Sequence, residues 1–326
     1  MEKTSRSDKI RLLIVIVNYR TPEMVLDCLE SLLSAVDDID AKVVVVDNDS
    51  QDDSDKHIIR WIRDNQATDI IKFIASDENS GFSGGNNLGI ESICAENYLL
   101  LNSDTLIKGN AIYKLLDNTD KFPDAGLFSP RLEWPDGIPQ ESCFRFLTPV
   151  GELISAARTG PVTKAFAKYN VPIAVSDQIS YPEWTSFACV LVRGQVFEDI
   201  GLMDDKFFMY FEDVEFCHRA GASGWKIIND PSAHVVHLRG GSSPVKENAR
   251  TGKRLPRYYY ESRTRYFYKL YGWKGLLKAN LFWSLGRIIS LTRELLGKKA
   301  PHVSHKQWLD IWANLRCPDA PYTKPK

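Results

Sequence analysis

Runs of apolar residues that end abruptly in polar side chains set the pattern of the first hundred residues. Runs rich in β-branched residues over 11–19, 42–47 and 70–75 predict buried parallel strands. An apolar stripe at three- to four-residue spacing over 22–33 predicts a helix after the first strand, and a second helix is expected through 58–62. This alternation of strand and helix predicts an α/β fold with a doubly wound, mostly parallel sheet.

The stretch YLLLNSDT, at 98–105, shows the same pattern in its sharpest form. Four apolar or aromatic residues predict a buried strand, and Asn102, Ser103 and Asp104 follow it directly. A carboxylate just past the carboxyl end of a buried strand lies where open α/β sheets bind ligands. Because burying a lone charge is costly, Asp104 is expected at a water-exposed rim or beside a cation. Asp and Thr are also favourable helix N-caps, so the pattern leaves a structural role open.

The segment 78–90 carries Gly81, Gly84 and Gly85 and is expected to be a loop. Glycine lets the backbone approach a ligand or adopt a positive φ, and glycine-rich loops that open a helix often cradle phosphate. The spacing is neither GxGxxG nor that of a Walker loop, so a plain turn is the alternative. A helix is expected to follow, as far as about Glu96.

Further along the chain, the apolar pattern predicts a helix over 109–118 and a strand over 184–194. Two short strands are expected at 226–230 and 233–238. The segment 151–182 shows no clear period and is expected to be helix and loop.

Four polar sites lie at the ends of these hydrophobic elements: Asp47, Asp104, the pair Glu212 and Asp213, and His237. Each has a structural explanation, since acidic residues suit helix N-termini by the dipole alone and a lone histidine is often a core residue. An acidic residue after the second strand of such a sheet often binds ribose or a base edge. The recurrence of this arrangement favours a shared functional site over four separate structural roles.

Charge is distributed unevenly, although the net charge of the 326 residues is only −1. Residues 246–326 carry 18 Lys and Arg against 5 Asp and Glu, a balance of +13. Such a basic, aromatic-rich tail is expected to meet phosphate, an anionic membrane or nucleic acid, and no nucleic-acid-binding motif is present. Six apolar residues in the tail recur at helical spacing: Leu277, Leu281, Leu285, Ile288, Leu291 and Leu295. The pattern is typical of a helix lying in a membrane interface, and packing on the rest of the chain or on a second copy is the alternative.

A composition of 44% hydrophobic and 25% charged residues is that of an ordinary globular protein. The six cysteines are scattered without a CxxC pair, which predicts reduced thiols rather than a disulfide framework. The N-terminus does not resemble a signal peptide, and no run approaches the ~18 uncharged apolar residues of a membrane span. We therefore expect a cytoplasmic protein that binds peripherally to the inner face of the plasma membrane.

Taken in order, six motifs of this chain resemble those of the inverting family 2 glycosyltransferases of GT-A fold, and in particular the rhamnosyltransferase-like enzymes of bacterial cell-surface polysaccharide synthesis. The motifs are VIVNYRT, VVVDNDS, NSGFSGGNNLGI, LLLNSDT, FFMYFEDVEFCHRAGASGW and HVVHLRGGSS. The ordered set is specific, although no single motif is. The resemblance covers about residues 10–245. It implies a GT-A domain at 1–245, with a Rossmann-like, mostly parallel central sheet flanked by helices, followed by a basic, amphipathic helical extension at 246–326.

The resemblance also implies a set of roles. The donor would be a nucleoside-diphosphate sugar whose pyrophosphate is bridged by Mn²⁺ or Mg²⁺, with Asp104 and His237 as metal ligands. Asp213 would be the general base, with Glu212 beside it shaping the acceptor pocket, and Trp184 would begin the acceptor-side strand. The donor and its nucleotide would be held by Val17, Asn18, Tyr19, Arg20, Asp47, Asn79, Gly81, Phe82, Gly85, Asn86, Asn102, Ser103 and Asp104.

One position departs from the family pattern, since Asn102 stands where the first Asp of the DXD motif is usual, which leaves one carboxylate fewer beside the metal. The implied acceptor is a glycan or a polyprenyl-diphosphate-linked sugar, and the implied donor sugar is L-rhamnose or a similar hexose. One alternative is another nucleotide-using enzyme on a doubly wound sheet, such as a nucleotidyltransferase or a methyltransferase, which leaves Asp213 and His237 unexplained. The other is a catalytically degenerate nucleotide-binding scaffold of a membrane-associated glycan-synthesis complex.

Overall fold

The computed structural model describes residues 9–238, 244–297 and 302–324. The chain divides into two compact units that are each assembled from three segments. The first unit comprises residues 1–143, 174–205 and 216–242, and the second comprises 144–173, 206–215 and 243–326. The organisation expected from the sequence, with a catalytic domain at 1–245 and an extension at 246–326, stays a prediction.

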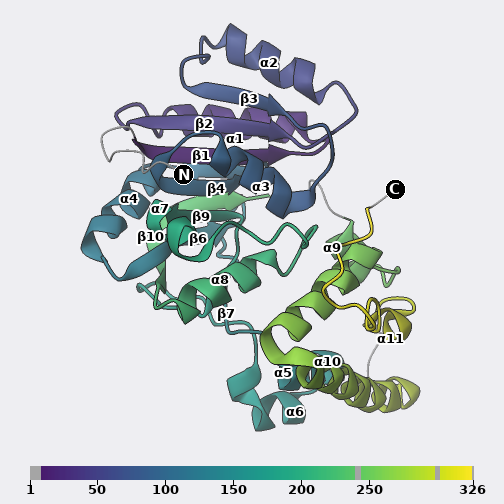
Figure 1. Ribbon diagram of the computed structural model, residues 1–326. Coiled ribbons are helices and arrows are strands. Elements are labelled where there is room, and N and C mark those ends of the chain that lie inside the picture. The colour runs from purple at the N-terminus through teal and green to yellow at the C-terminus, as the bar shows by residue number, and fades with distance from the viewer. Residues whose placement is uncertain (1–8, 239–243, 298–301, 325–326) are drawn as a thin grey trace. The chain divides into compact units, whose positions relative to one another are not determined.

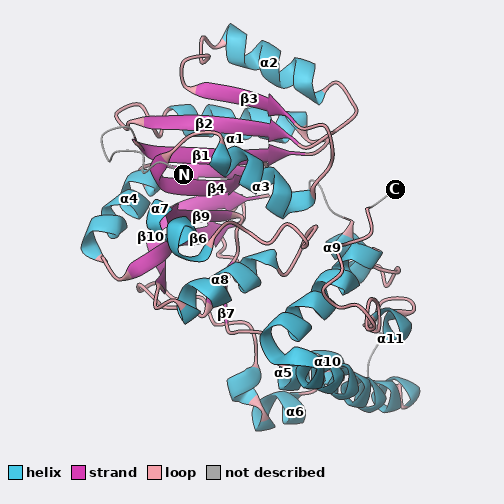
Figure 2. Cartoon of the chain, in the orientation of Figure 1, coloured by secondary structure: helices cyan, strands magenta, loops and turns pink. Residues whose placement is uncertain are grey.

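An eight-stranded sheet with the strand order β3-β2-β1-β4-β9-β6-β10-β5 forms the centre of the first unit (Figure 2). Four successive strands pair in parallel: β1 (Ile10–Asn18), β2 (Ala41–Asp47), β3 (Ile71–Ala75) and β4 (Ala95–Asn102). The other half contains β5 (Thr105–Lys108), β6 (Ala125–Glu133), β9 (Cys189–Arg193) and β10 (Lys226–His237). Of these, β9 and β5 run antiparallel to their neighbours, whereas β6 and β10 are parallel to each other. The mostly parallel α/β sheet predicted from the sequence is therefore confirmed.

Helices connect these strands, and those at 22–33, 54–64 and 111–121 lie where the sequence predicted helices. They are α1 (Pro22–Leu33), α2 (Ser54–Asp64), α3 (Gly81–Glu91), α4 (Ala111–Lys121) and α7 (Gly194–Ile200), and the larger part of α8 (Glu212–Ala222) also belongs to this unit. The chain runs outward from β1 to β3 on one side and then returns to place β4 on the other side of β1. Such a reversal is the point at which open α/β sheets bind ligands, beyond the carboxyl ends of the strands.

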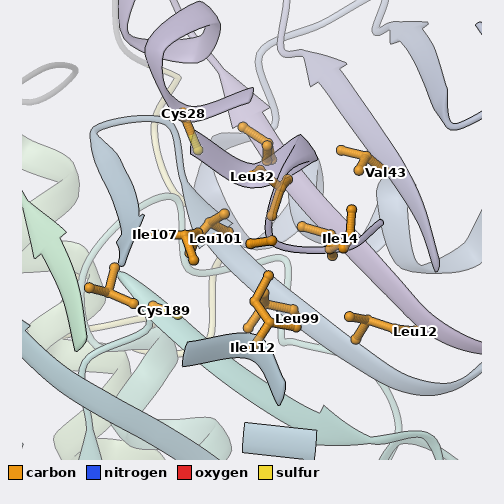
Figure 3. Packing of buried hydrophobic residues seen from close by; sticks show 14 of the residues in the cluster. Leu12, Ile14, Cys28, Leu32, Val43, Leu99, Leu101, Ile107, Ile112 and Cys189 are labelled. Atoms are coloured by element: carbon orange, nitrogen blue, oxygen red, sulfur yellow. The ribbon is translucent and has the colours of Figure 1, made fainter. Parts of the chain in front are cut away.

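The first unit has an aliphatic core between the sheet and its helices (Figure 3). Residues of one face of the strands, such as Leu12, Ile14 and Leu99, meet Leu32 of α1 and Ile112 of α4. Each of these side chains is fully or almost fully buried, and burying one is worth about 1.5–3 kcal/mol. The continuous apolar runs of the strands and the 3.6-residue apolar period of the helices reflect this packing in the sequence.

Two predicted boundaries in this unit were wrong. The helix expected to reach Glu96 ends at Glu91, because β4 begins at Ala95, which pairs with Ile10 of β1. The strand expected over 184–194 is broken into β8 (Trp184–Thr185) and β9. The break follows from a change of partner: the Thr185 hydroxyl and the backbone amide of residue 186 both donate to the Ser142 carbonyl, whereas β9 pairs with β4.

The two short strands expected at 226–230 and 233–238 form one strand, β10, that ends at His237. The sequence break between them survives as an irregularity, since the register with β6 shifts between Asp230 and His234. Because β10 stays paired with β6 on both sides of the shift, the two predicted segments belong to one strand.

The second unit is mainly helical, and α5 and α6 lie beside α10 in Figure 1. Its elements are α5 (Pro149–Ala157), α6 (Gly160–Ala165), the short 3₁₀ helix η2 (Ala167–Tyr169), α9 (Val245–Arg250), α10 (Arg257–Leu295) and α11 (Gln307–Asp310), and the two-residue strand β7 (Cys143–Phe144) leads into it. Gly272 divides α10 into two halves because its φ of 63° and ψ of −171° lie outside helical geometry. Within the described residues, no helix has the length and apolar composition needed to cross a membrane.

Candidate functional site

The carboxyl ends of β1, β2 and β4 bring four of the predicted donor-side residues to one edge of the sheet. Asn18 is in register with Asp47, and Val17 with Asn102. Asn18 is completely buried, and its Nδ2 donates to the Asp47 carboxylate at 2.6 Å. The sequence order strand, turn, helix therefore delivers these polar side chains to the ligand-binding edge of the fold.

Asp47 is held by the chain itself. Besides the bond from Asn18, its carboxylate accepts the Ser50 hydroxyl at 2.6 Å and the Ser50 backbone amide at 3.2 Å. The Ser50 hydroxyl oxygen in turn accepts the backbone amide of Arg20 at 2.9 Å, and the Arg20 guanidinium donates to the Ser50 carbonyl at 2.8 Å. The buried carboxylate thus fixes the two loops after β1 and β2. The Arg20 guanidinium also lies over the Tyr19 ring. The contacts of Asp47 and Tyr19 with the nucleoside stay predictions.

Asn48 is a buried residue that the sequence reasoning missed. Its side-chain nitrogen donates to the Asn79 side chain at 3.0 Å and to the Gly81 carbonyl at 2.9 Å, and its oxygen accepts the backbone amide of Ser80. Asn79 also accepts the Gly81 amide at 3.0 Å. One amide side chain therefore ties the end of β2 to the start of α3. The signal in the sequence was a second polar residue directly after Asp47.

The glycine-rich segment is helix rather than loop over most of its length, which corrects the expectation from the sequence. Only Gly81, with φ at 71°, has a backbone conformation that favours glycine. A Cβ on Gly85 would lie 2.8 Å from Val17 Cγ1, and one on Gly89 would collide with Val15. These glycines let α3 approach β1 closely. The Nδ2 atom of buried Asn86 donates to the Phe82 carbonyl within the same helix.

Asp104 and His237 meet because β5 and β10 pair in antiparallel register. Thr105, the residue after Asp104, lies opposite His237, and the backbone amide of Leu238 donates to the Asp104 carbonyl at 2.9 Å. The Asp104 Oδ1 atom lies 3.4 Å from His237 Nε2, and both residues are buried. The structure thus joins two residues that are 133 positions apart in sequence and that the resemblance assigned to one metal.

The other ring nitrogen, Nδ1 of His237, is buried without a hydrogen-bond partner among the described residues. A buried polar atom without a partner is unusual in a folded protein. Ser103 contributes a hydroxyl nearby in sequence, 3.3 Å from that of Thr21. The residues of the motif after Leu238, at 239–243, lie outside the described part of the chain.

The Asp104 and His237 pair fits a divalent cation with an incomplete protein shell. Two ligands of one octahedral cation at about 2.1 Å lie about 3 Å apart, close to the 3.4 Å between Oδ1 and Nε2. The residues that the structure describes contain no group of three His, Cys, Asp or Glu side chains arranged to hold a metal. Cations of the Mg²⁺ type commonly take one or two protein ligands and complete their shell with substrate phosphates and water. The donor set therefore suits a cation that binds together with a diphosphate.

The acidic pair Glu212 and Asp213 belongs to the second unit and opens α8. Burial raises the pKa of Asp213 to about 6, although its carboxylate accepts the Val214 amide at 2.8 Å. Burial and the neighbouring Asp213 charge raise the pKa of Glu212 well above its ordinary value. The Glu212 Oε2 atom has no hydrogen-bond partner among the described residues. Two adjacent carboxyl groups with raised pKa values are a feature of catalytic sites.

The turn before this pair is strained. Tyr210 and Phe211 have φ values of 72° and 71°, in the left-handed region that bulky residues rarely adopt. Each such residue costs about 1–3 kcal/mol and persists only where the surrounding structure holds it. Trp184, predicted on the acceptor side, is half-buried in β8 of the first unit, and its contact with an acceptor stays a prediction.

Comparison with known proteins identifies the family of this chain. Residues 13–141 match the family described as Glycosyl transferase family 2. The chain is 31% identical over 228 residues to a low-salt glycan biosynthesis hexosyltransferase of Haloferax volcanii, covering 69% of this chain and 66% of that protein. This chain belongs to glycosyl transferase family 2.

Two further proteins are similar to this chain. An N-acetylglucosaminyl-diphospho-decaprenol L-rhamnosyltransferase of Mycobacterium tuberculosis is 25% identical over 221 residues, covering 65% of this chain and 67% of that protein. A mannosyltransferase from Pyrobaculum calidifontis, solved with GDP-Man and Mn²⁺, superposes with a TM-score of 0.51 at 14% identity, covering 95% of this chain and 86% of that one. The second likeness shows the GT-A type of fold alone. The chain matches about two thirds of the length of these curated relatives.

Proposed function

We propose that this family 2 chain transfers a hexosyl group from a nucleoside-diphosphate sugar to a hydroxyl of a glycan or polyprenyl-diphosphate-linked acceptor in cell-surface glycan synthesis. The observation that carries the proposal is the buried Asp104 and His237 pair at the ligand-binding edge of the sheet. The names of the relatives support it, since one is a glycan biosynthesis hexosyltransferase and the other a rhamnosyltransferase whose name includes a diphospho-decaprenol-linked sugar. L-Rhamnose or a similar hexose is the sugar that we propose.

On the donor side, Asp104 and His237 would hold Mn²⁺ or Mg²⁺. When bound, such a cation stabilises the negative charge that develops on a leaving diphosphate. The network of Asn18, Asp47 and Ser50 presents the loops after β1 and β2 in fixed positions for the nucleoside. Because these loops are already held by internal bonds, binding the nucleotide costs little ordering of the protein.

On the acceptor side, Asp213 would be the general base. The bond between the anomeric carbon and the diphosphate oxygen breaks, and the nucleoside diphosphate leaves with its electron pair. The acceptor oxygen forms its bond on the opposite face of the sugar, so the configuration inverts, and its proton passes to the Asp213 carboxylate. A base with a pKa of about 6 suits this step, because it is ionised at neutral pH and still accepts a proton readily.

The first experiment is a thermal-shift series with GDP, UDP, dTDP and their sugar conjugates, with and without Mn²⁺. A ligand at ~100 times its dissociation constant raises stability by ~2.7 kcal/mol. We expect one nucleoside diphosphate to stabilise the protein in a Mn²⁺-dependent way, and His237→Ala to abolish the metal dependence. His234→Ala is the matched control, because His234 lies on the same strand but pairs with Glu133 at 3.0 Å. Failure of every nucleotide in the presence of Mn²⁺ would contradict the proposal.

The alternative, a scaffold that binds nucleotide without catalysis, is favoured by Asn102 in place of the first Asp of the DXD motif. It predicts the same nucleotide-dependent stabilisation. The two differ in turnover: a transferase releases free nucleoside diphosphate from the sugar conjugate when an acceptor is added, and a scaffold does not.

We further propose that the second half of α10 docks on an anionic membrane, where a polyprenyl-linked acceptor resides. Its buried face includes Leu276, Trp283 and Gly286, whereas the opposite face is exposed and apolar. The exposed residues are Leu277, Leu281, Leu285, Ile288, Leu291 and Leu295, with exposed fractions between 41% and 79%. Lys274 and Lys278, which flank Leu277, are also exposed. The charge balance of +13 over residues 246–326 complements an anionic lipid surface.

Vesicle sedimentation tests this docking surface. The unaltered chain should bind vesicles that contain phosphatidylglycerol and not neutral ones, and the double variant Leu281→Ser, Ile288→Ser should lose binding. The control Ile70→Ser, Ile138→Ser removes two exposed apolar residues of the first unit and should bind normally. If the α10 variant instead converts a dimer to a monomer in light scattering without any effect on vesicle binding, the face is a contact between two copies of the chain and the membrane proposal is wrong.

A further inference from the structure

The segment that carries the acidic pair, residues 206–215, is attached along the first half of α10 within the second unit. Contacts with α10 occur at each position from 207 to 211 and again at 215. The Phe207 ring lies against Arg265, and the Phe208 ring lies against the Tyr258 ring. The Met209 carbonyl accepts a hydrogen bond from the Ser262 hydroxyl. Tyr210 and Phe211 both contact the Tyr259 ring, and Glu215 forms an ion pair with Lys269. The acidic pair is therefore built on the C-terminal helix rather than on the strands that carry Asp47 and Asp104.

The strained turn lies at the centre of this attachment. Tyr210 and Phe211 both have positive φ, and Glu212 follows at once as the first residue of α8. Strained backbone of this kind relaxes unless neighbouring groups over-determine it. Relaxation of either residue would rotate the chain just before Glu212 and Asp213 and redirect both carboxyl groups.

One side chain touches both strained residues. The Tyr259 ring lies 5.6 Å from the Tyr210 ring and 5.6 Å from the Phe211 ring. Phe211 makes a second ring contact with Tyr266, which lies two turns further along α10, at 5.5 Å between the ring centres. Aromatic pairs at these separations attract each other beyond the burial of their area, so the two tyrosines hold the turn in its strained form.

The part of α10 between Tyr259 and Tyr266 is itself held in place by a buried arginine. Arg263 is buried and donates to Glu152 of α5 at 2.7 Å and to Asn280 of the second half of α10 at 2.7 Å. A guanidinium that is satisfied on both sides gives one orientation of the helix rather than several. Tyr259 and Tyr266 therefore project from a rigid support.

We propose that Tyr259, assisted by Tyr266, is a positioning residue that holds the strained turn at Tyr210 and Phe211 and thereby aims Asp213 at the acceptor hydroxyl. The inference rests on the proposed function and deepens it, because it makes the first half of α10 part of the acceptor-activating machinery. It predicts that damage to this contact lowers turnover and leaves the donor side intact.

The test compares Tyr259→Leu, Tyr259→Phe and Tyr258→Leu in the full chain. Tyr258 is the matched control, because it is the adjacent residue of α10 and packs on Phe208 outside the strained turn. For Tyr259→Leu we expect kcat to fall 10- to 100-fold, with the Kd of the nucleoside diphosphate and the KM of the donor within twofold of the unaltered chain. Tyr259→Phe keeps the ring and should retain kcat within threefold, as should Tyr258→Leu.

A second measurement does not depend on activity. Amide hydrogen exchange across residues 209–215 should become at least tenfold faster in Tyr259→Leu than in Tyr258→Leu, because the turn loses its support. Unchanged exchange, unchanged kcat, an equal loss in Tyr258→Leu, or a concurrent loss of nucleotide binding in Tyr259→Leu would each overturn the proposal. An unaltered chain that binds nucleotide but transfers no sugar would contradict the proposed function instead, and the exchange experiment would still decide the role of Tyr259.

Discussion

The two units of this protein bury different kinds of side chain. In the first, the strands and α1 bury leucine, isoleucine and valine almost completely. In the second, α10 buries charged groups, including Arg263 and Glu261, together with aromatic side chains such as Tyr260 and Tyr266. Its leucines and isoleucines, by contrast, make up much of the exposed apolar surface. An apolar residue in these strands or in α1 is a reliable sign of the core, and in α10 it is not.

The reason lies in how closely the helices approach. A Cβ added to Gly286 would lie 2.5 Å from the Leu153 carbonyl and 2.9 Å from Ala156 Cβ of α5. Only a residue without a Cβ allows that distance at this point of the helix. The face of leucine and isoleucine has no such position. Helical periodicity shows that two faces differ, and close packing decides which one turns inward.

The largest difference between the two units is expected when the Asp213 carboxylate of the second unit is removed. We expect Asp213→Asn to lower kcat by ~10²–10⁴-fold, the usual worth of general-base catalysis, while nucleotide binding to the first unit is unchanged. Rates of transfer and thermal shifts with nucleoside diphosphate measure the two effects separately. Transfer at a near-normal rate would show that the base lies elsewhere.

The charged core of the second unit gives the next largest effect. Arg263→Met leaves Glu152 buried without its partner, and breaking a buried pair in this way typically costs ~3–5 kcal/mol. Replacing both, as Arg263→Met with Glu152→Leu, removes the unpaired charge and should recover most of the loss. Denaturant unfolding of the two variants checks this. An equal loss in both would mean that packing, rather than the ion pair, supports this core.

The sequence predicted the first unit better than the second for the same physical reason. Strands buried on both faces appear in the sequence as continuous apolar runs that end in polar residues. The α/β sheet and the placement of Asp104 at a strand end could therefore be predicted. The contact between Asp104 and His237 came only from family resemblance, because it depends on the register of β5 and β10.

Features that depend on long-range packing could not be predicted. The roles of Asn48, which joins the end of β2 to α3, and of Tyr259 are set by contacts between segments far apart in the chain. The helical character of the glycine-rich segment was also missed, because its glycines serve close approach to Val15 and Val17 rather than flexibility. Local pattern specifies elements and their ends, and steric fit between elements specifies the rest.

The dependence of kcat/KM on pH should show a smaller effect, which comes from Asp213 of the second unit. Burial raises the pKa of Asp213 to about 6, and a general base works only when it is ionised. The value of kcat/KM should therefore be level above pH 6 and fall about tenfold for each pH unit below it. Burial and the Asp213 charge raise the pKa of Glu212 as well, but Glu212 is not the proposed base, so Glu212→Gln should keep the fall in kcat/KM at a similar pH. A limb near pH 4 would show that Asp213 is not desolvated in solution.

The smallest effect is expected at the leucine face of α10, and it tests the comparison most directly. Leu285, with 47% of its surface exposed, lies on the exposed leucine face, whereas Trp283 and Gly286 are buried. Leu285→Ala should change the free energy of unfolding by no more than ~0.5 kcal/mol, as for other surface positions. Leu101→Ala, in the aliphatic core of the first unit, should cost ~2–5 kcal/mol. Chemical denaturation at low protein concentration without lipid gives both values. A loss of more than ~2 kcal/mol for Leu285→Ala would mean that this face is already covered in solution, and a dependence of that loss on protein concentration would identify the cover as a second copy of the chain.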